Sequence, residues 1–196
     1  VVSLVVTYWV YDLSSLYSLA WLDGIALGQG DILVNVNAGF DETSALLRAS
    51  FPEVKLLILD FYDPAKHTEV SIKRARKAYP PYPGTLSVQT TSLPLADASV
   101  DCFVATLAAH EIRDNAERVT FLKEVNRVLK PNGRVVVTEH LRDAANYLAY
   151  NFGAFHFHSK ETWLDNFQSS GFKVEREINT TPFISTFILS KNGATS

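Results

Sequence analysis

The sequence has a single cysteine, no excess of positive charge and no apolar run long enough for a membrane span. The lone Cys102 excludes an internal disulfide or a multi-cysteine metal site, and it fits a reducing cytosol. The net charge of −3 excludes a global field that would attract nucleic acid or an anionic membrane. The apolar residues 1–10 lack a basic flank and a cleavage site, and Asp12 interrupts them early. We therefore expect a cytoplasmic protein without a nucleic-acid or membrane partner.

The chain contains enough hydrophobic residues to form the core of one domain. It has 196 residues, of which 47% are hydrophobic and 20% charged, so a sizeable core can form without disulfides. Residues 1–30 are rich in tyrosine and tryptophan, which suggests one or two helices before the sheet. We expect this segment to be a helical lid, and residues 31–196 to form a single domain.

Apolar strands alternate with amphipathic helices along that domain. Residues 100–106 and 134–138 read as buried strands, separated by a helix over 114–129 that Pro131, Asn132 and Gly133 end. A long helix between two such strands implies a right-handed crossover in a parallel sheet. The other predicted strands are 32–36, 54–59, 86–89, 172–178 and 183–190, and the other predicted helices are 41–50, 68–79 and 159–170. The pattern predicts an α/β fold with a doubly wound sheet.

Two stretches carry a family resemblance. Residues 101–110 and the run Arg127-Val-Leu-Lys-Pro-Asn-Gly-Arg134, preceded by Leu93-Pro-Leu-Ala-Asp97, resemble the class I S-adenosylmethionine-dependent methyltransferases that act on small molecules. The resemblance implies a Rossmann-like, mostly parallel seven-stranded sheet with the last strand antiparallel. It also implies S-adenosylmethionine as cofactor and a small organic acceptor as partner.

The first strand-to-helix turn departs from the family pattern. The family has an acid followed by three glycines here, whereas this chain keeps Gly39 alone, with Asn35 at the acid and Asn37 at the first glycine. A glycine after a strand lets the backbone approach a ligand, and the next helix offers free N–H donors. Asn35, Asn37 and Gly39 are therefore candidate cofactor-binding residues. A plain turn without a ligand is the alternative.

Further candidates follow the second, third and fourth strands. Asp60 ends an apolar strand about twenty residues after the glycine turn, where a carboxylate accepts ribose hydroxyls. Capping of the next turn is the alternative role for Asp60. The resemblance adds Phe61 beside it and places Leu107 at the methionine end of the cofactor. It also puts Gln89 and Thr90 near adenine, where an amide oxygen can accept a hydrogen bond, unless Gln89 is a solvated edge residue.

Candidate catalytic residues lie at the ends of the fourth and fifth strands. They are His110, His140 and Arg142. A histidine can take a proton near neutral pH, and an arginine can hold a carboxylate or phenolate. A structural histidine bonded to a neighbouring loop is the alternative for His110. Apolar walls for an acceptor are expected from Tyr11, Tyr147, Phe152 and Phe155.

Two sequence patterns that suggest a metal site and an RNA site have simpler explanations. His140, His156 and His158 suggest a metal, but their spacing is loose and methyl transfer needs none, so no metal site is predicted. The basic residues 73–77 are better read as a solvated helix face than as an RNA site. The eroded glycine turn leaves a non-catalytic methyltransferase-like binding protein as an alternative, and a nicotinamide-dependent oxidoreductase as a second.

Overall fold

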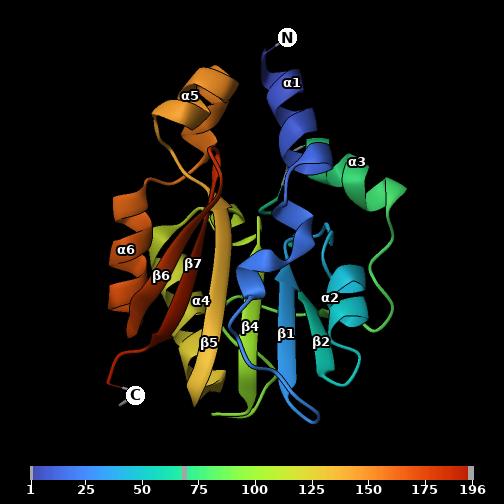
Figure 1. Cartoon of the computed structure of the whole chain (residues 1–196), viewed down its shortest axis with the longest axis vertical. Coiled ribbons are helices and arrows are strands. Elements are labelled where there is room, and N and C mark those ends of the chain that lie inside the picture. The colour runs from blue at the N-terminus through green and yellow to red at the C-terminus, as the bar shows by residue number, and fades with distance from the viewer. Residues whose placement is uncertain (1, 68–69, 194–196) are drawn as a thin grey trace.

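The computed structural model describes residues 2–67 and 70–193, and its centre is a seven-stranded sheet (Figure 1). The strand order is β3-β2-β1-β4-β5-β7-β6. The strands are β1 Ile32–Asn37, β2 Lys55–Asp60, β3 Leu86–Ser87, β4 Val100–Thr106, β5 Leu129–His140, β6 Phe172–Thr181 and β7 Ile184–Lys191. The pairs from β3 through β5 are parallel, and β7 is antiparallel to both of its neighbours. The predicted doubly wound, mostly parallel α/β sheet with its last strand antiparallel is confirmed.

Helices cover both faces and one edge of the sheet. The α-helices are α1 Val2–Tyr8, α2 Ser44–Ser50, α3 Val70–Ala78, α4 Asn115–Val128, α5 Ala144–Tyr150 and α6 Lys160–Ser169. The shorter helical turns are η1 Trp9–Leu13, η2 Leu16–Ser18, η3 Ala20–Leu22, η4 Ala109–Glu111 and η5 Asn151–His156. The helix expected over 68–79 begins at Val70 in the described residues, and positions 68–69 lie outside them.

Two apolar clusters lie on opposite faces of the sheet. On one face, Phe121 of α4 and Phe167 of α6 join a large cluster with Phe103 and Phe187 of the strands. On the other face, η3 and α2 pack with the sheet, and Trp21 of η3 is only 2% exposed. A domain with both faces covered fits the near-continuous apolar sequence of its central strands.

The N-terminal segment divides into two parts with different packing. Helix α1 has no buried residue, whereas Leu19, Trp21 and Leu22 belong to the cluster beneath α2. The Trp21 indole N–H donates to the Leu16 carbonyl oxygen at 2.9 Å, which satisfies its polar atom in the core. The second part of the segment is therefore a layer of the domain.

The connection from α4 to β5 is tighter than the sequence predicts. Helix α4 ends at Val128 and β5 starts at Leu129, so Pro131 and Gly133 lie within the long strand instead of in a loop. A Cβ atom on Gly133 would lie 2.8 Å from the Leu129 side chain and 2.9 Å from the Asp101 carbonyl oxygen. The glycine is needed there because the backbone has no room for a side chain.

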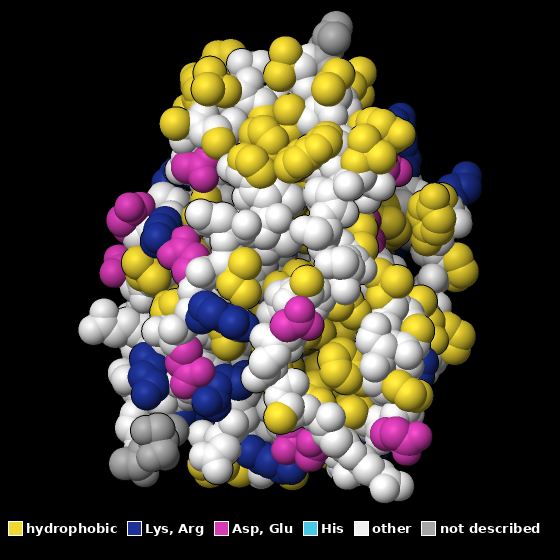
Figure 2. Space-filling model, viewed as in Figure 1, with side chains coloured by type: hydrophobic (Ala, Val, Ile, Leu, Met, Phe, Trp, Pro, Cys, Tyr) yellow, Lys and Arg dark blue, Asp and Glu magenta, His cyan; other side chains and the backbone are white. Residues whose placement is uncertain are grey.

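Three helices, α1, α3 and α5, stand above the edge where the parallel strands end (Figure 1). Figure 2 shows apolar side chains gathered at this end of the molecule. Exposed members from α1 and the adjoining η1 include Leu4 and Leu13, and those from α5 and η5 include Leu148 and Phe152. None of the described helices is both long and apolar enough to cross a membrane.

Candidate active site

Two cavities open at the carboxyl edge of the sheet. The first, of about 720 Å³, lies beyond β2 and β3 and is lined by Phe61, Gln89 and Thr90. The second, of about 510 Å³, lies beyond β1, β4 and β5 and is lined by residues that include Leu107, His110, His140 and Tyr11. Glu111 lines both cavities. Ligands of doubly wound sheets bind at this edge, so the cavities are the candidate active site.

In the first turn, Asn35 and Asn37 have different surroundings. The Asn35 side chain is buried and bonds within the turn, donating to Ser44 Oγ at 2.9 Å and accepting from Thr43 Oγ1 at 3.2 Å. Asn37 Oδ1 accepts the Gly39 N–H at 3.0 Å, but its buried Nδ2 has no hydrogen-bond partner in the described chain. Gly39 has a φ of +99°, which favours glycine. Asn37 is therefore the asparagine with a donor left for a ligand.

The Asp60 carboxylate is already engaged by the protein. Its Oδ2 accepts from Arg76 Nη1 of α3 at 2.6 Å, and its Oδ1 accepts the Tyr62 N–H at 2.8 Å. The Arg76 guanidinium also lies 4.3 Å from the centre of the Tyr62 ring, which packs against Gly39. A ribose that bonds to Asp60 must therefore share or displace Arg76.

The adenine-side candidates come together in the first cavity. Thr90 donates from Oγ1 to Glu117 Oε1 at 2.5 Å, and Lys66 pairs with the same carboxylate oxygen at 2.8 Å. Phe61 is buried with its ring centre 5.7 Å from that of Phe121. The cavity thus combines an apolar floor with polar groups at its rim.

His110 is held between carboxylates. Its Nδ1 lies 2.6 Å from Oε2 of the fully buried Glu139, and its backbone N–H donates to Glu139 Oε1 at 3.2 Å. Burial alone would lower the pKa of His110, but the Glu139 charge and hydrogen bonds to Glu111 and Glu139 raise it to about 10. A histidine that is protonated at neutral pH cannot accept a proton. The geometry thus favours the anchoring role over the general base.

His140 has the opposite electrostatics. Its Nδ1 lies within hydrogen-bond distance of two acceptors, Asn146 Oδ1 at 3.0 Å and the Phe183 carbonyl oxygen at 2.9 Å, so that nitrogen carries the proton. Its Nε2 is then an acceptor and faces the Tyr11 hydroxyl at 3.1 Å. Burial lowers the pKa of His140 to about 4, which keeps the ring neutral. The Nε2 lone pair of His140 thus lies at the wall of the second cavity, where the Tyr11 hydroxyl donates to it.

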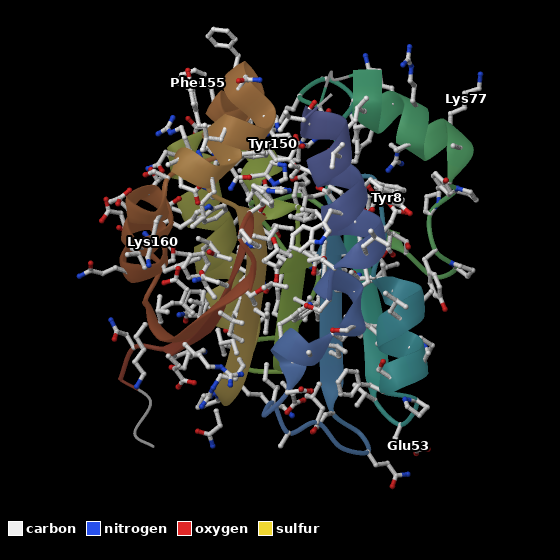
Figure 3. All side chains as sticks on the ribbon, turned by 45° about the horizontal axis from the view of Figure 1, so that its top comes forward. Tyr8, Glu53, Lys77, Tyr150, Phe155 and Lys160 are labelled. Atoms are coloured by element: carbon white, nitrogen blue, oxygen red, sulfur yellow. The ribbon has the colours of Figure 1, made fainter. Side chains whose placement is uncertain are left out.

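The structure does not bring every predicted residue to the cavities. Asn35, Asn37, Gly39 and Asp60 lie at the strand ends without lining either cavity. Arg142 is exposed, also lines neither cavity, and donates its backbone N–H to the His158 carbonyl oxygen at 2.8 Å. Tyr147, Phe152 and Phe155 are exposed on α5 and η5. Figure 3 places Phe155 on the side of this segment away from α1, with Tyr150 on the side facing it.

Sequence reasoning missed several residues of the second cavity. They include Phe40, Glu42, Tyr150 and Phe157. The sequence from Tyr150 to Phe157 does not predict which residues line the cavity, because closely spaced aromatic residues do not reveal which rings point inward. The histidines of the discounted metal pattern are separated: His158 Nε2 lies 3.0 Å from Arg118 Nη1, whereas His140 Nε2 faces Tyr11.

The chain is similar in sequence to methyltransferases. A family model described as "Methyltransferase domain" matches residues 62–137, a range that begins after the first turn. The demethylmenaquinone methyltransferase of Chlamydia muridarum is 28% identical over 119 residues, covering 60% of this chain and 48% of that protein. The ubiquinone/menaquinone biosynthesis C-methyltransferase UbiE of Geobacter sulfurreducens is 27% identical over 126 residues, covering 62% and 44%. The chain spans about half the length of these curated relatives.

Solved structures share the fold. A SAM-dependent methyltransferase from Aquifex aeolicus matches with a TM-score of 0.63 and 16% identity, over 90% of this chain and 89% of that one. The putative methyltransferase in a complex with the Haloferax volcanii Trm112 activator matches with a TM-score of 0.67 and 16% identity, over 92% and 91%. At these identities the matches establish the arrangement of strands and helices.

Proposed function

We propose that this chain is an S-adenosylmethionine-dependent methyltransferase that transfers a methyl group to a small organic acceptor, a function that the methyltransferase-domain match over residues 62–137 supports. When bound, S-adenosylmethionine supplies a methyl group on a positive sulfonium, an electrophile that needs no activation by the protein. The observation that carries the proposal is the pair of adjoining cavities at the carboxyl edge of the sheet, one of which holds a neutral imidazole.

The residues present fit the cofactor at both of its ends. Asn37 and Gly39 would hold the amino-acid end, and the unpaired Asn37 Nδ2 supports this because a buried donor without a partner costs free energy. Phe61 and Gln89 would hold the base in the first cavity. Asp60 would accept the ribose once Arg76 moves aside.

The second cavity fits an aromatic acceptor with a hydroxyl group. Rings of Tyr11, Tyr150 and Phe157 line it, and an apolar cavity with few polar groups suits a small ligand. The curated relatives are named for methylating quinone precursors, so we propose a phenol or quinol as acceptor. His140 Nε2 would take its hydroxyl proton once the acceptor replaces the Tyr11 hydroxyl at that nitrogen, and the walls would exclude water and orient the ring.

The proposal is tested by binding and turnover. Calorimetry should show S-adenosylhomocysteine binding, and transfer of labelled methyl should be found in a screen of phenols and quinols. His140→Gln should lower the rate about 100-fold or more while leaving S-adenosylhomocysteine affinity unchanged. Tyr150→Ala should weaken acceptor binding, whereas Leu148→Ala, which changes an exposed residue of α5, should not. Full turnover by His140→Gln on a verified acceptor would remove His140 from the proton-accepting role.

A non-catalytic binding protein is the second candidate, because Arg76 occupies the carboxylate that would hold the ribose. Cofactor binding without methylation of any acceptor would favour it. The methyltransferase match weakens the nicotinamide alternative, and NADH titration tests that directly. We also place the protein in the cytoplasm without a nucleic-acid partner, on the strength of its free buried Cys102 and net charge of −3.

A further inference from the structure

We propose that His110, Glu111 and His156 form a binding site for a divalent transition-metal ion beside the second cavity. Two histidine nitrogens and one carboxylate oxygen from these residues all lie within 4.8 Å of one another. His110 and Glu111 belong to η4, which follows β4, and His156 ends η5. Two segments that are distant in the sequence thus bring three metal-ligand side chains to one point. Of the three histidines that suggested a metal in the sequence, only His156 belongs to this site, where it joins His110 and Glu111.

The distances within the cluster are long for charge-assisted hydrogen bonds and suit ligands around one shared cation. Glu111 Oε1 lies 3.3 Å from His110 Nε2 and 3.5 Å from His156 Nε2. Charge-assisted hydrogen bonds are shorter, about 2.7–2.9 Å. Ligand atoms bound about 2.0–2.1 Å from a tetrahedral metal lie about 3.3 Å apart. The Glu111 oxygen is therefore spaced from both nitrogens as a ligand around one ion would be.

Glu139 supplies the support that a metal-bound histidine needs. A ligating imidazole generally donates its other ring N–H to a carboxylate, which fixes the ring and strengthens the ligand. His110 Nδ1 makes this contact with the fully buried Glu139 at 2.6 Å, leaving Nε2 directed toward Glu111. The ring orientation is thus set before any ion binds, and a bound ion would displace the Nε2 proton that His110 otherwise carries at neutral pH.

The ligand set indicates the chemistry of the ion. Two imidazoles and one carboxylate suit a first-row divalent ion such as Zn²⁺ or Fe²⁺, and three protein ligands leave a coordination position open. Because His110 and Glu111 line the second cavity, an oxygen of a bound acceptor can fill that position. Metal binding itself does not depend on the proposed methyl transfer, so the two are tested by separate readouts.

The test uses the full chain, freed of any purification tag, treated with a chelator and titrated with Co²⁺. We expect one equivalent to bind with a visible absorption band, and Zn²⁺ to displace it. His156→Ala and Glu111→Gln should each weaken Co²⁺ binding at least tenfold. Glu139→Gln should weaken it by about 10–100-fold, because the carboxylate orients His110.

Matched controls come from elsewhere in the chain. His67→Gln and Glu161→Gln remove one histidine and one acid that are not in the cluster, and both should bind Co²⁺ like the unaltered protein. His156 is partly exposed, and a thermal unfolding curve of His156→Ala checks that the variant is folded. The proposal is overturned if the unaltered chain shows no saturable Co²⁺ binding. It is equally overturned if His156→Ala and Glu111→Gln bind as tightly as the controls.

Discussion

At the scale of single residues, the ion pair between Asp60 and Arg76 determines what the candidate ribose site can bind. Asp60 stands where a ribose-binding acid was predicted, yet its ion pair comes from Arg76, sixteen residues away. The prediction that residues 73–77 form a solvated face holds for Lys73, Arg74 and Lys77, which are exposed. Arg76 instead turns inward, because a buried carboxylate without a partner would be costly. Composition alone cannot show which of the four basic side chains in residues 73–77 points toward Asp60.

The Asp60–Arg76 pair leads to opposite predictions for its two members. Asp60→Ala should weaken S-adenosylhomocysteine binding by about 1.5–3 kcal/mol, since it removes hydrogen bonds to a charged group. Arg76→Ala should tighten binding, because the ribose no longer competes for the carboxylate. Calorimetry measures both, with the exposed Arg74→Ala on the same helix as the control. Weaker binding in Arg76→Ala would mean that the arginine assists the ligand.

His140 predicts a pH dependence of folding stability. Its pKa falls from 6.5 to about 4 in the folded protein, so between these values the unfolded chain binds more protons. The free energy of unfolding should therefore rise with pH across this window, and fall as acid is added. The half-buried His158, whose pKa is also lowered to about 4, contributes to the pH dependence of stability with the same sign.

Urea unfolding of the unaltered chain and of His140→Gln, measured from pH 4.5 to 7.5, tests whether His140 causes this pH dependence of the free energy of unfolding. The variant should show a shallower loss of stability toward acid, because glutamine does not titrate. Equal slopes would exclude His140 as a source of the acid sensitivity.

At the scale of elements, periodicity predicted the strands and the long helices, and it failed on α5 and η5. Residues 144–156 lack the alternation of polar and apolar faces that marks a surface helix. A local signal was present: Asp143 is a favourable N-cap residue, and it accepts the Asn146 N–H at 2.8 Å. The third strand is shorter than predicted because only Leu86 and Ser87 pair with β2.

The junction of α4 and β5 predicts a large effect from a small substitution. Gly133→Ala should destabilise the protein by about 1–3 kcal/mol, because the added methyl group meets Leu129 and the Asp101 backbone. Gly153→Ala is the matched control, since its Cβ would make an ordinary 3.5 Å contact with Tyr150. Urea unfolding measures both variants, and equal stability would show that β5 shifts easily to make room.

At the scale of the whole molecule, the expected lid of residues 1–30 is tested by comparing its two parts. Deleting residues 1–8 should cost about 1 kcal/mol or less, because α1 has no buried residue. It should lower turnover, however, since Thr7 lines the second cavity. Trp21→Ala should cost about 3–5 kcal/mol, because Trp21 is part of the core.

Circular dichroism during heating, combined with a turnover assay, separates these effects. Global unfolding after deletion of residues 1–8 would make α1 a structural part of the domain. Full turnover after the same deletion would mean that the second cavity needs no cover from α1.

Glu111 forms part of the wall of both cavities, so binding in one cavity can be coupled to binding in the other. A ligand in one cavity that shifts this carboxylate changes the affinity of the other cavity for its own ligand. The coupling must be reciprocal: whatever factor the first ligand imposes on the second, the second imposes on the first. The cofactor and the acceptor can in this way change each other's binding affinity through a single side chain, in addition to any direct contact between them.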